Sequence, residues 1–425
     1  MPLRIVIITY NWIPRNAIGT HRPYAWAKYW RELGAEITVL TAEKKPFDEP
    51  LDLELEKLSG VHIIEVAYGS RADTFGRILS LGFVRQAARH VKKLLGKRAA
   101  SVIDPRNAWY DAAKPIARNL VSQTDVVVST FGPPAAHLLA MEMKVANPQL
   151  RWVADYRDLW SQRRTGDIPD ALRAKMREQE IGSVGRYADE IIAVSKDMVA
   201  QLSSLLKKPV HLSPNGFDMD EEVVRERLSC PLISRSGPLR IVYTGMIYPG
   251  HRDPLPLLNA LSQLRRRGEL EDGMVTVDFY GDRVEVGMAL AKKPEYAPFI
   301  RLMGHVTREK ALEAQRNADI LLLLESPAPE ARGVLTGKIF EYIVSGRPIL
   351  CIGSRPEYEI GEVLNDTGTG VVIGPQQYEK LPLLISDSIS GAGLFLDYKP
   401  SYEAILRFSR KRQSYDVFRF ISHND

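Results

Sequence analysis

In the stretch from Thr336 to Leu350, Lys338 directly follows a glycine, and Glu341 stands three residues after the lysine. At that spacing the two side chains share one face of a helix, close to its N-terminus. The free backbone N–H groups of a helix N-terminus bind phosphate, and a lysine adds positive charge. A carboxylate one turn further on can accept hydrogen bonds from ribose hydroxyls. The stretch therefore predicts a nucleotide site, although an exposed Lys/Glu pair that only stabilises a helix has the same spacing.

The residues around this pair predict a loop, a helix and a buried strand. Thr336 is a candidate N-cap, and Gly337 allows a ligand to approach the backbone closely. Gly346 can end the helix, and Ile349–Ile352 continues as a strand. A P-loop is excluded, because Arg332 stands where the first glycine of that motif would be.

The composition is that of an ordinary globular protein. The chain has 425 residues, of which 45% are hydrophobic and 26% charged, enough for two or three domains. Its two cysteines, Cys230 and Cys351, lie far apart, which indicates a reducing compartment and excludes a disulfide framework. We find no signal-peptide pattern before the first predicted strand and no apolar run long enough to span a bilayer. These features predict a cytoplasmic protein.

The net charge of +5 is concentrated in one segment. Residues 74–103 carry +7 and contain no acidic residue, so the remaining chain sums to −2. This distribution argues against a nucleic-acid-binding protein. The amphipathic helix predicted at 83–97 has two interpretations. It can lie on an anionic membrane surface, which would make the protein peripheral on the inner face of the membrane, or it can pack on its sheet with a solvated basic face.

Apolar strands alternate with predicted helices in both halves of the chain. In the first half the predicted strands are Leu3–Thr9, Glu36–Leu40, Val61–Val66, Asp125–Thr130, Arg151–Asp155 and Glu190–Val194. The predicted helices there are Tyr24–Leu33 with Pro23 at its first position, Phe83–Leu95, Pro133–Met141 and Leu172–Tyr187. In the second half the strands are Arg240–Thr244, Val275–Tyr280, Ile300–Met303, Ala318–Leu324 and Gly370–Ile373, and the helices include Pro254–Arg266 and Arg308–Arg316.

Continuous apolar strands between helices indicate parallel sheets that are covered on both faces. A Pro/Ser/Gly-rich stretch at 230–238 separates the two runs of strands. The predicted fold is therefore α/β, with two doubly wound, Rossmann-like domains that face a cleft. Ligands of such sheets bind beyond the carboxyl ends of the strands.

Several stretches together resemble the GT-B glycosyltransferases, and within them the retaining glycosyltransferase family 4. Residues Ala154–Trp160 (Ala-Asp-Tyr-Arg-Asp-Leu-Trp) resemble an Asp-Phe-Arg-Asp-Pro-Trp stretch of many members. Residues Pro214–Asp218 (Pro-Asn-Gly-Phe-Asp) resemble the Asn-Gly-hydrophobic-Asp turn before the second domain. The other landmarks, in order, are the loop with Gly19 and Arg22, Tyr243–Gly245, Arg252–Pro254, Gly304–Val306 and the Lys338–Glu341 block.

This resemblance implies a domain organisation and a reaction. An N-terminal domain at 1–217 would hold the acceptor, and a C-terminal domain at 239–398 would hold a nucleotide-diphosphate sugar. A C-terminal helix at about 400–425, within which Tyr402–Phe420 fits best, would cross back to the first domain. The family implies retention at the anomeric carbon, with the leaving phosphate accepting the acceptor proton. Glycosidases differ, since they need two carboxylates at a defined spacing.

The resemblance also implies roles for individual residues. Glu341 would bind the ribose hydroxyls, and the rest of the donor site would comprise Gly19, Gly245, Arg252, Thr336, Gly337 and Lys338. Since negative charge grows on the diphosphate as the sugar leaves, fixed hydrogen-bond donors there stabilise the transition state more than the ground state. No metal or other cofactor is expected, and the histidines show no metal-ligand spacing.

Four residues of the first domain are candidates for the acceptor side of the reaction. His137 is near where the family often has a sugar-contacting histidine, and Asp158 could orient the acceptor, so these two are the candidate catalytic residues. Arg22 and Asp155 are candidate acceptor contacts. Each also has a structural alternative. His137 can be a surface residue in a first helical turn, and Asp158 can pair with Arg157 or a helix end. Arg22 can be a solvated arginine at a helix start.

Two positions depart from the family pattern. Gly333 stands where a glutamate often touches the sugar, and Glu330 or Glu325 could substitute for it. Met246 stands where an arginine often follows Gly245. The resulting prediction is a retaining glycosyltransferase that uses a glycan, glycolipid or lipid-linked acceptor in polysaccharide or cell-surface glycan biosynthesis. The alternatives are a nucleotide-sugar epimerase on the same fold, which needs acid/base groups at the sugar, and a catalytically weak sugar-nucleotide-binding protein, which the two departures favour.

Overall fold

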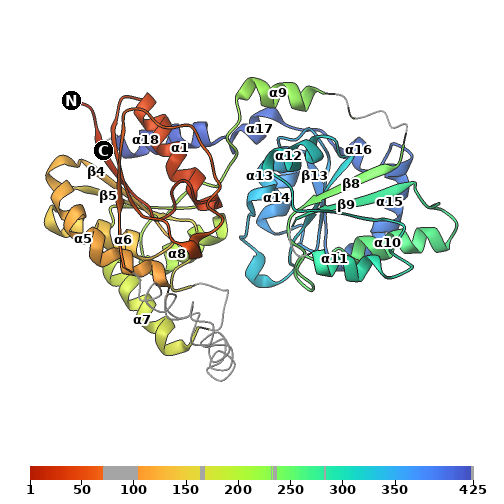
Figure 1. The fold of residues 1–425 in the computed structure, drawn as a ribbon, viewed down its shortest axis with the longest axis horizontal. Coiled ribbons are helices and arrows are strands. Elements are labelled where there is room, and N and C mark those ends of the chain that lie inside the picture. The colour runs from red at the N-terminus through yellow and green to blue at the C-terminus, as the bar shows by residue number, and fades with distance from the viewer. Residues whose placement is uncertain (70–103, 163–167, 231, 233–236, 282–283, 423–425) are drawn as a thin grey trace. The chain divides into compact units, whose positions relative to one another are not determined.

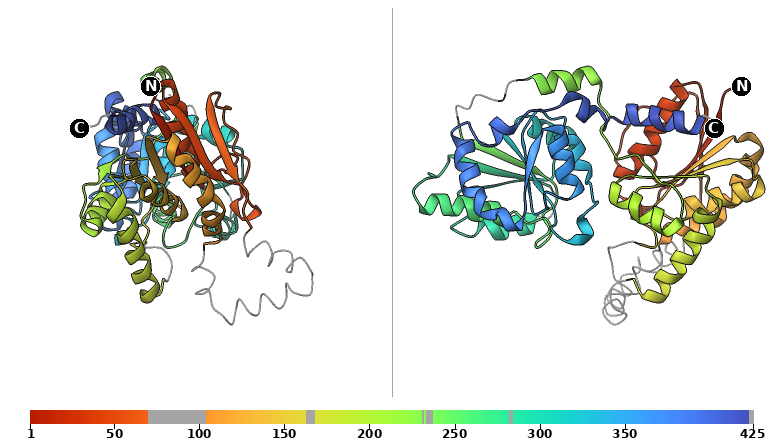
Figure 2. Two further views of the ribbon diagram at one scale, coloured as in Figure 1. Left: turned by 90° about the vertical axis from the view of Figure 1, so that its left-hand side faces the viewer. Right: turned by 180° about the vertical axis from the view of Figure 1, so that it is seen from behind.

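The structure is a computed structural model that describes residues 1–69, 104–162, 168–230, 232, 237–281 and 284–422 (Figure 1). The chain divides into two compact units. Residues 1–214 and 413–425 form the first unit, and residues 215–412 form the second. Each unit contains a parallel sheet with helices on both faces (Figure 1, Figure 2), so the predicted α/β fold class is confirmed.

Within the described residues, the sheet of the first unit has seven parallel strands in the order β3-β2-β1-β4-β5-β6-β7. The strands are β1 (Arg4–Ile8), β2 (Glu36–Ala42), β3 (Val61–Val66), β4 (Val126–Thr130), β5 (Arg151–Tyr156), β6 (Glu190–Ala193) and β7 (His211–Leu212). The strand order reverses between β1 and β4. The loops that follow these two strands turn to opposite faces of the sheet and leave a crevice between them, where ligands of doubly wound sheets bind.

Helices cover both faces of this first sheet. They are α1 (Ile18–Glu32), α5 (Trp109–Leu120), α6 (Ala135–Ala146), α7 (Asp170–Glu180), α8 (Lys196–Leu206) and α18 (Arg410–Ser422). Short 3-10 helices are η1 (Pro46–Asp48), η2 (Pro105–Ala108) and η3 (Val121–Gln123), and η4 (Ile181–Gly185) is a π-helix. Side chains alternate along each strand. Ile5 and Ile7 of β1 therefore pack in one core with α1 and α18, while Val6 and Ile8 pack in another with α5, α6 and α8.

Helix α1 begins at Ile18, six residues before the predicted start at Tyr24. Ala17 is still extended, and the hydroxyl of Thr20 in the first turn donates to the Arg15 carbonyl at 2.8 Å. Pro23 therefore lies inside the helix and not at its first position. Its missing N–H removes one backbone hydrogen bond from the helix, and tertiary packing of the buried aromatic face outweighs this local signal.

The sheet of the second unit has six parallel strands in the order β10-β9-β8-β11-β12-β13 among the residues that the structure describes. They are β8 (Leu239–Thr244), β9 (Val275–Tyr280), β10 (Ile300–Gly304), β11 (Ile320–Leu324), β12 (Ile349–Ile352) and β13 (Gly370–Ile373). The order reverses between β8 and β11, so this unit has its own switch point.

The helices of the second unit also lie on both faces of the sheet. They are α9 (Glu221–Ser229), α10 (Leu255–Arg266), α11 (Val284–Ala291), α12 (Arg308–Arg316), α13 (Gly337–Tyr342), α14 (Glu359–Thr367), α15 (Leu381–Ile389), α16 (Leu394–Asp397) and α17 (Tyr402–Leu406), with turns η5 (Pro329–Ala331) and η6 (Pro375–Lys380). One core cluster joins the sheet to α10 and α15, and a second joins it to α13, α14 and α17.

The second unit extends on both sides of the predicted range 239–398. Val224 of α9 is buried in the same cluster as Ile405 of α17. The Arg412 guanidinium donates to both carboxylate oxygens of Glu221 at 2.8 Å, and the Tyr402 hydroxyl donates to the Glu221 carbonyl at 3.2 Å. These contacts attach the helix before the linker, and the chain after residue 398, to the second sheet.

The single C-terminal helix predicted at Tyr402–Phe420 is two helices, α17 and α18. Between them, the carbonyl of Phe408 accepts a hydrogen bond from the Phe217 N–H, and the Arg410 N–H donates to the Phe217 carbonyl. Because the backbone of this segment pairs with Phe217, the helix is interrupted. From Gln413 onward the chain belongs to the first unit, where the Trp30 indole N–H donates to the Ser414 carbonyl at 2.7 Å.

The basic helix predicted at 83–97 lies outside the described residues, so contact with a membrane stays a prediction. In the described part of the chain, we find no helix with the length and apolar composition needed to cross a bilayer.

Candidate functional site

The switch point of the second unit brings Lys338 against Gly245. A Cβ atom at Gly245 would lie 2.2 Å from Cε of Lys338 and 2.5 Å from its Nζ, so any larger residue would displace the end of the lysine side chain. The ammonium also lies 5.5 Å from the centroid of the Tyr243 ring. Burial and the neighbouring Arg252 lower the pKa of Lys338. The two residues come from a loop after β8 and from α13, which sequence spacing alone could not join.

A carboxylate stands beside this lysine, directly after β11. Glu325 is 7% exposed, and its Oε1 accepts a hydrogen bond from the Thr336 hydroxyl at 2.9 Å. Its Oε2 lies 3.9 Å from Nε of Arg252. Burial raises the pKa of Glu325, while Arg252, Thr336 and Lys338 act in the opposite direction. The predicted donor residues Arg252, Thr336 and Lys338 therefore surround a buried carboxyl group.

This arrangement bears on the glutamate that is missing at position 333. Gly333 is buried, and Glu330 lies exposed on η5. Of the two carboxylates that could substitute, Glu325 contacts the predicted donor-site residues Thr336 and Arg252.

Glu341 lies on α13 in a network that fixes its carboxylate. Arg308 Nη2 donates to its Oε1 at 3.0 Å, and Gln315 Nε2 donates to its Oε2 at 3.4 Å. Gln315 also donates to the Thr244 hydroxyl at the end of β8, and the Tyr342 hydroxyl lies 3.1 Å from the same oxygen. The Glu341 side chain is 31% exposed, so its carboxylate is held in place and still open to a ligand.

The start of α13 was predicted correctly, and its end was not. Thr336 occupies the N-cap position, but its hydroxyl donates to Glu325 and caps nothing. The helix ends at Tyr342 and not at Gly346, where a Cβ would lie 2.5 Å from the Arg227 carbonyl oxygen. A helix of six residues has a weak dipole. The positive charge that could meet a phosphate here therefore comes from side chains.

The two predicted acceptor contacts, Arg22 and Asp155, are paired with each other. Arg22 Nε and Nη2 lie 3.1 and 3.0 Å from Oδ1 of Asp155, and Nη1 donates to the Pro214 carbonyl at 2.9 Å. The guanidinium also stacks on Trp26, 4.7 Å from its ring centroid. The side chains are 5% and 0% exposed, so in this structure the pair holds α1, β5 and the end of the first unit together and is closed to an acceptor.

Gly19 lies in the first turn of α1 and packs on Arg157. A Cβ at Gly19 would lie 1.6 Å from Nη1 of Arg157. The same guanidinium donates to the Thr130 hydroxyl at 2.9 Å and to the Phe131 carbonyl. The glycine therefore makes space for an arginine at the end of β4, and a role toward the donor diphosphate stays a prediction.

His137 is buried on α6 and is not the surface residue of the structural alternative. Its Nδ1 lies 2.7 Å from the Ser129 hydroxyl, which also accepts a hydrogen bond from the Trp152 indole N–H at 2.8 Å. Burial lowers the pKa of His137 to about 3, and Arg157 contributes in the same direction. The imidazole is therefore neutral and enclosed, which does not fit the predicted sugar contact. Asp158, by contrast, is exposed in the loop after β5.

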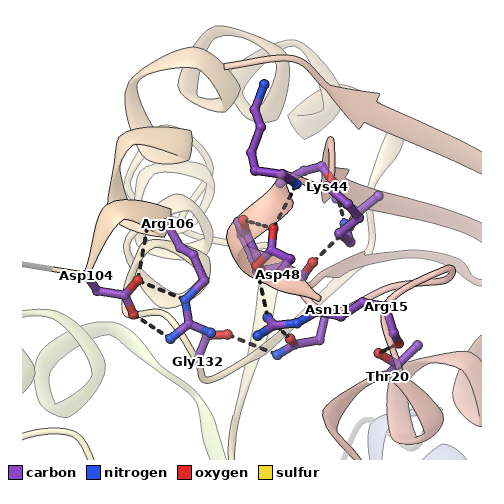
Figure 3. Close-up of polar contacts among 12 residues, drawn as sticks. Asn11, Arg15, Thr20, Lys44, Asp48, Asp104, Arg106 and Gly132 are labelled. Carbon is purple, nitrogen blue, oxygen red and sulfur yellow. Dashed lines mark hydrogen bonds and ion pairs between the residues drawn. The ribbon is translucent and has the colours of Figure 1, made fainter. Parts of the chain in front are cut away.

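A further polar cluster, which the sequence did not reveal, lies at the switch point of the first unit (Figure 3). Arg15 follows β1, Lys44 follows β2, and Arg106 lies on η2, all close to the buried carboxylate of Asp48. Arg15 and Lys44 stand in loops that follow predicted strands, whose carboxyl ends meet at one edge of the sheet, but nothing in the sequence singled out these residues. Among the described residues, no three His, Cys, Asp or Glu side chains come together as metal ligands.

Comparisons with known proteins show the fold. No family model matches the sequence, and no curated protein does. A glycosyltransferase from Rickettsia africae is 15% identical, with a TM-score of 0.56 over 100% of both chains. The Escherichia coli trehalose-6-phosphate protein solved with UDP-2-fluoro glucose is 11% identical, with a TM-score of 0.62 over 99% of both chains. An α,α-trehalose-phosphate synthase from Burkholderia xenovorans in complex with glucose-6-phosphate is 10% identical, with a TM-score of 0.61 over 99% of this chain and 100% of the other.

These solved structures share the architecture of two Rossmann-like domains, so the chain has the GT-B fold that its sequence predicted. At 10–15% identity the similarity establishes the fold and leaves the activity to be argued from the site. Membership of family 4 stays a prediction.

Proposed function

We propose that this protein is a retaining glycosyltransferase that moves a sugar from a nucleotide-diphosphate sugar to a glycan, glycolipid or lipid-linked acceptor. One observation carries the proposal. At the switch point of the second unit, Lys338 lies against Gly245, and Glu341 is held on the same short helix. The ammonium suits a diphosphate, and the carboxylate suits ribose hydroxyls. A structural neighbour solved with UDP-2-fluoro glucose supports a sugar-nucleotide donor.

In this proposal the cations stabilise the leaving group. Negative charge grows on the diphosphate as the bond to the anomeric carbon breaks. Lys338 and Arg252 meet that charge in a partly buried site, where fixed charges act more strongly than in water. An oxygen of the leaving diphosphate takes the proton of the acceptor hydroxyl as the new glycosidic bond forms on the same face. The charge stabilisation comes from side chains, without a metal or other cofactor.

Glu325 replaces the carboxylate that is absent at Gly333. Its hydrogen bond from Thr336 and its proximity to Arg252 orient the group. A carboxyl group held in this way can accept or donate a hydrogen bond to a sugar hydroxyl. Glu325→Gln should therefore raise the KM for the donor sugar nucleotide more than it weakens the binding of the bare nucleotide diphosphate.

The acceptor class connects the proposal to polysaccharide or cell-surface glycan assembly. Such acceptors are often held at a membrane, and the basic segment 83–97 would bring the enzyme to an anionic surface. Sedimentation with vesicles that contain anionic lipid tests this part. We expect binding to the vesicles that weakens as the salt concentration rises. An absence of binding at low salt would contradict the proposed contact with a membrane.

The experiment that tests the function is a thermal-shift screen of nucleotide sugars on the full-length protein, followed by product analysis. A ligand that binds the native state raises the melting temperature, and at a given concentration a tighter ligand raises it more. We expect stabilisation by one group of nucleotide sugars and transfer to an acceptor. An isomerised sugar nucleotide formed without an acceptor would instead identify an epimerase. Binding without turnover over a broad acceptor panel would identify a catalytically weak binding protein.

A further inference from the structure

Arg15, Lys44 and Arg106 lie near Asp48 at the switch point of the first unit (Figure 3). All three cations also lie around one aromatic ring. The Arg15 and Arg106 guanidinium carbons lie 5.8 and 5.7 Å from the centroid of the Tyr10 ring. The Lys44 ammonium lies 5.3 Å from the same centroid. They come from loops after β1 and β2 and from the turn before α5, so the fold, and not local sequence, brings them together.

A buried polar floor fixes this cluster. Asp48 is fully buried, and its Oδ2 accepts hydrogen bonds from the Tyr10 hydroxyl at 2.7 Å and from the Lys45 backbone N–H at 3.0 Å. Its Oδ1 lies 3.5 Å from Nη1 of Arg15. Arg15 also donates to the Asn11 side chain at 2.6 Å. The cations are therefore held in place before any ligand arrives, which lowers the entropic cost of binding.

The three cations lie close enough to repel one another. Burial lowers the pKa of Lys44 to about 8, although Glu65 and Asp48 oppose the shift, and Arg15 lowers it further. Burial also lowers the pKa of Arg15, which Arg106 depresses in turn. Each cation has one carboxylate near it: Asp104 pairs with Arg106 at 2.5 Å, Asp48 lies beside Arg15, and Glu65 acts on Lys44. Like charges gathered in a partly buried site favour binding of an anion.

We propose that Arg15, Lys44 and Arg106 bind a phosphoryl group carried by the acceptor substrate. Guanidinium groups donate paired hydrogen bonds to phosphate oxygens, and an ammonium adds a point charge. The inference rests on the proposed function and gives its acceptor a chemical class. The second unit already provides Lys338 and Arg252 for one diphosphate. A separate set of three cations in the other unit fits a second anion, which a sugar phosphate or a prenyl-linked phosphate would supply.

Titration of the full-length protein with inorganic phosphate tests the site, with the melting temperature and calorimetric heat as readouts. The double variant Arg15→Gln/Lys44→Gln should bind phosphate at least about tenfold more weakly, because it loses two charge-assisted contacts. Asp104→Asn removes a counter-charge and should bind phosphate more tightly, an opposite change that misfolding could not produce. Arg118→Gln removes an exposed charge at the far end of α5 and should leave phosphate binding unchanged.

The same variants, titrated with a nucleotide diphosphate and with candidate acceptors, separate this inference from the proposed function. We expect the variants to bind the nucleotide diphosphate as the wild type does. We also expect the wild type to bind a hexose phosphate or a short prenyl phosphate more tightly than the same compound without its phosphate. The tighter of the two phosphates identifies the source. Joint loss of phosphate and nucleotide binding would assign the cluster to the donor and overturn the inference. So would an absence of binding to every phosphate, even though nucleotide binding would then still support the proposed function. A protein that binds phosphate but no nucleotide would contradict the proposed function and the acceptor assignment together.

Discussion

At the level of single residues, the donor-site account depends most on Lys338. Its ammonium lies against Gly245 and beside Glu325, in a position where a diphosphate would complete its pairing. Lys338→Ala should lower kcat by roughly 10²–10³-fold, the usual cost of losing one fixed donor that acts on developing charge. Lys310→Ala, which removes an exposed charge from α12, is the matched control. Turnover of Lys338→Ala close to that of the wild type would contradict the assigned role.

His137 makes a second prediction at this scale, on stability. Its pKa is about 3 in the folded state and near 6.5 when exposed. Between about pH 3 and pH 6.5, the imidazole therefore binds a proton in the unfolded chain but not in the folded chain. The unfolding free energy should fall as the pH drops from about 6.5 toward 3, by up to about 1.4 kcal/mol per pH unit from this group.

Urea unfolding at several pH values measures the His137 effect against a His137→Phe variant. The variant keeps an aromatic ring among the surrounding rings but cannot titrate. Its stability should depend less on pH in this window than that of the wild type. Identical slopes for the two proteins would mean that the imidazole is not held neutral.

Single residues also mark the limit of what the sequence could predict. Lys338 and Glu341 were found together because their spacing is local and helical. The pairing of Arg22 with Asp155 joins positions 133 residues apart, and the hydrogen bond from Thr336 to Glu325 depends on how β11 and α13 meet. Such contacts arise from tertiary packing, which the spacing of residues along the sequence does not reveal.

At the level of elements, the ends of β11 and β12 position Glu325. A Cβ at Gly353, just after β12, would lie 2.1 Å from the Glu325 carbonyl oxygen, and Gly353 has a φ of +99°. Gly353→Ala should lower the unfolding free energy by about 2–4 kcal/mol, because left-handed strain and a backbone clash add. It should also weaken donor binding by displacing Glu325.

Gly391→Ala is the control for this substitution. Gly391 has a φ of +86°, but nothing lies within 4 Å of its added Cβ. It should cost only the left-handed strain, about 1 kcal/mol, and leave donor binding unchanged. Chemical unfolding curves give both values. Equal losses at the two glycines would show that β11 and β12 can separate freely.

Most helices and strands could be predicted from the sequence, whereas the residues at which several of them begin or end could not. Runs of apolar residues predicted the long strands because a strand buried on both faces needs them. Three helix ends differed from the prediction. Helix α1 begins six residues early, α13 ends at Tyr342, and the pairing of the backbone with Phe217 interrupts the chain before α18.

At the level of the whole molecule, the chain returns to its first unit at the end. Ile421 of α18 is 1% exposed in the core of that unit. All six tryptophans also lie in the first unit, so their fluorescence reports on its unfolding alone. Ile421→Ala should lower the stability of that transition by about 2–5 kcal/mol, while circular dichroism still shows the second unit folded. A tryptophan transition that does not move would mean that the C-terminal segment is not part of the first core.

Both candidate sites lie at a reversal of strand order, between β1 and β4 and between β8 and β11. The two doubly wound sheets were predicted from the alternation of elements, and the position of a site at each switch point follows from that topology. Which charged residues gather there could not be read from the sequence, because Arg15, Lys44 and Arg106 stand on three separate loops.

The central claim is that the second unit binds a nucleotide-diphosphate sugar through Lys338 and Glu341. Calorimetric titration of the full-length protein with the best nucleotide sugar tests it most directly, in the wild type and in Glu341→Ala. Saturable binding that weakens by about tenfold or more in the variant is predicted, since the ribose would lose a charge-assisted hydrogen bond. Unchanged affinity and turnover in Glu341→Ala would contradict the claim.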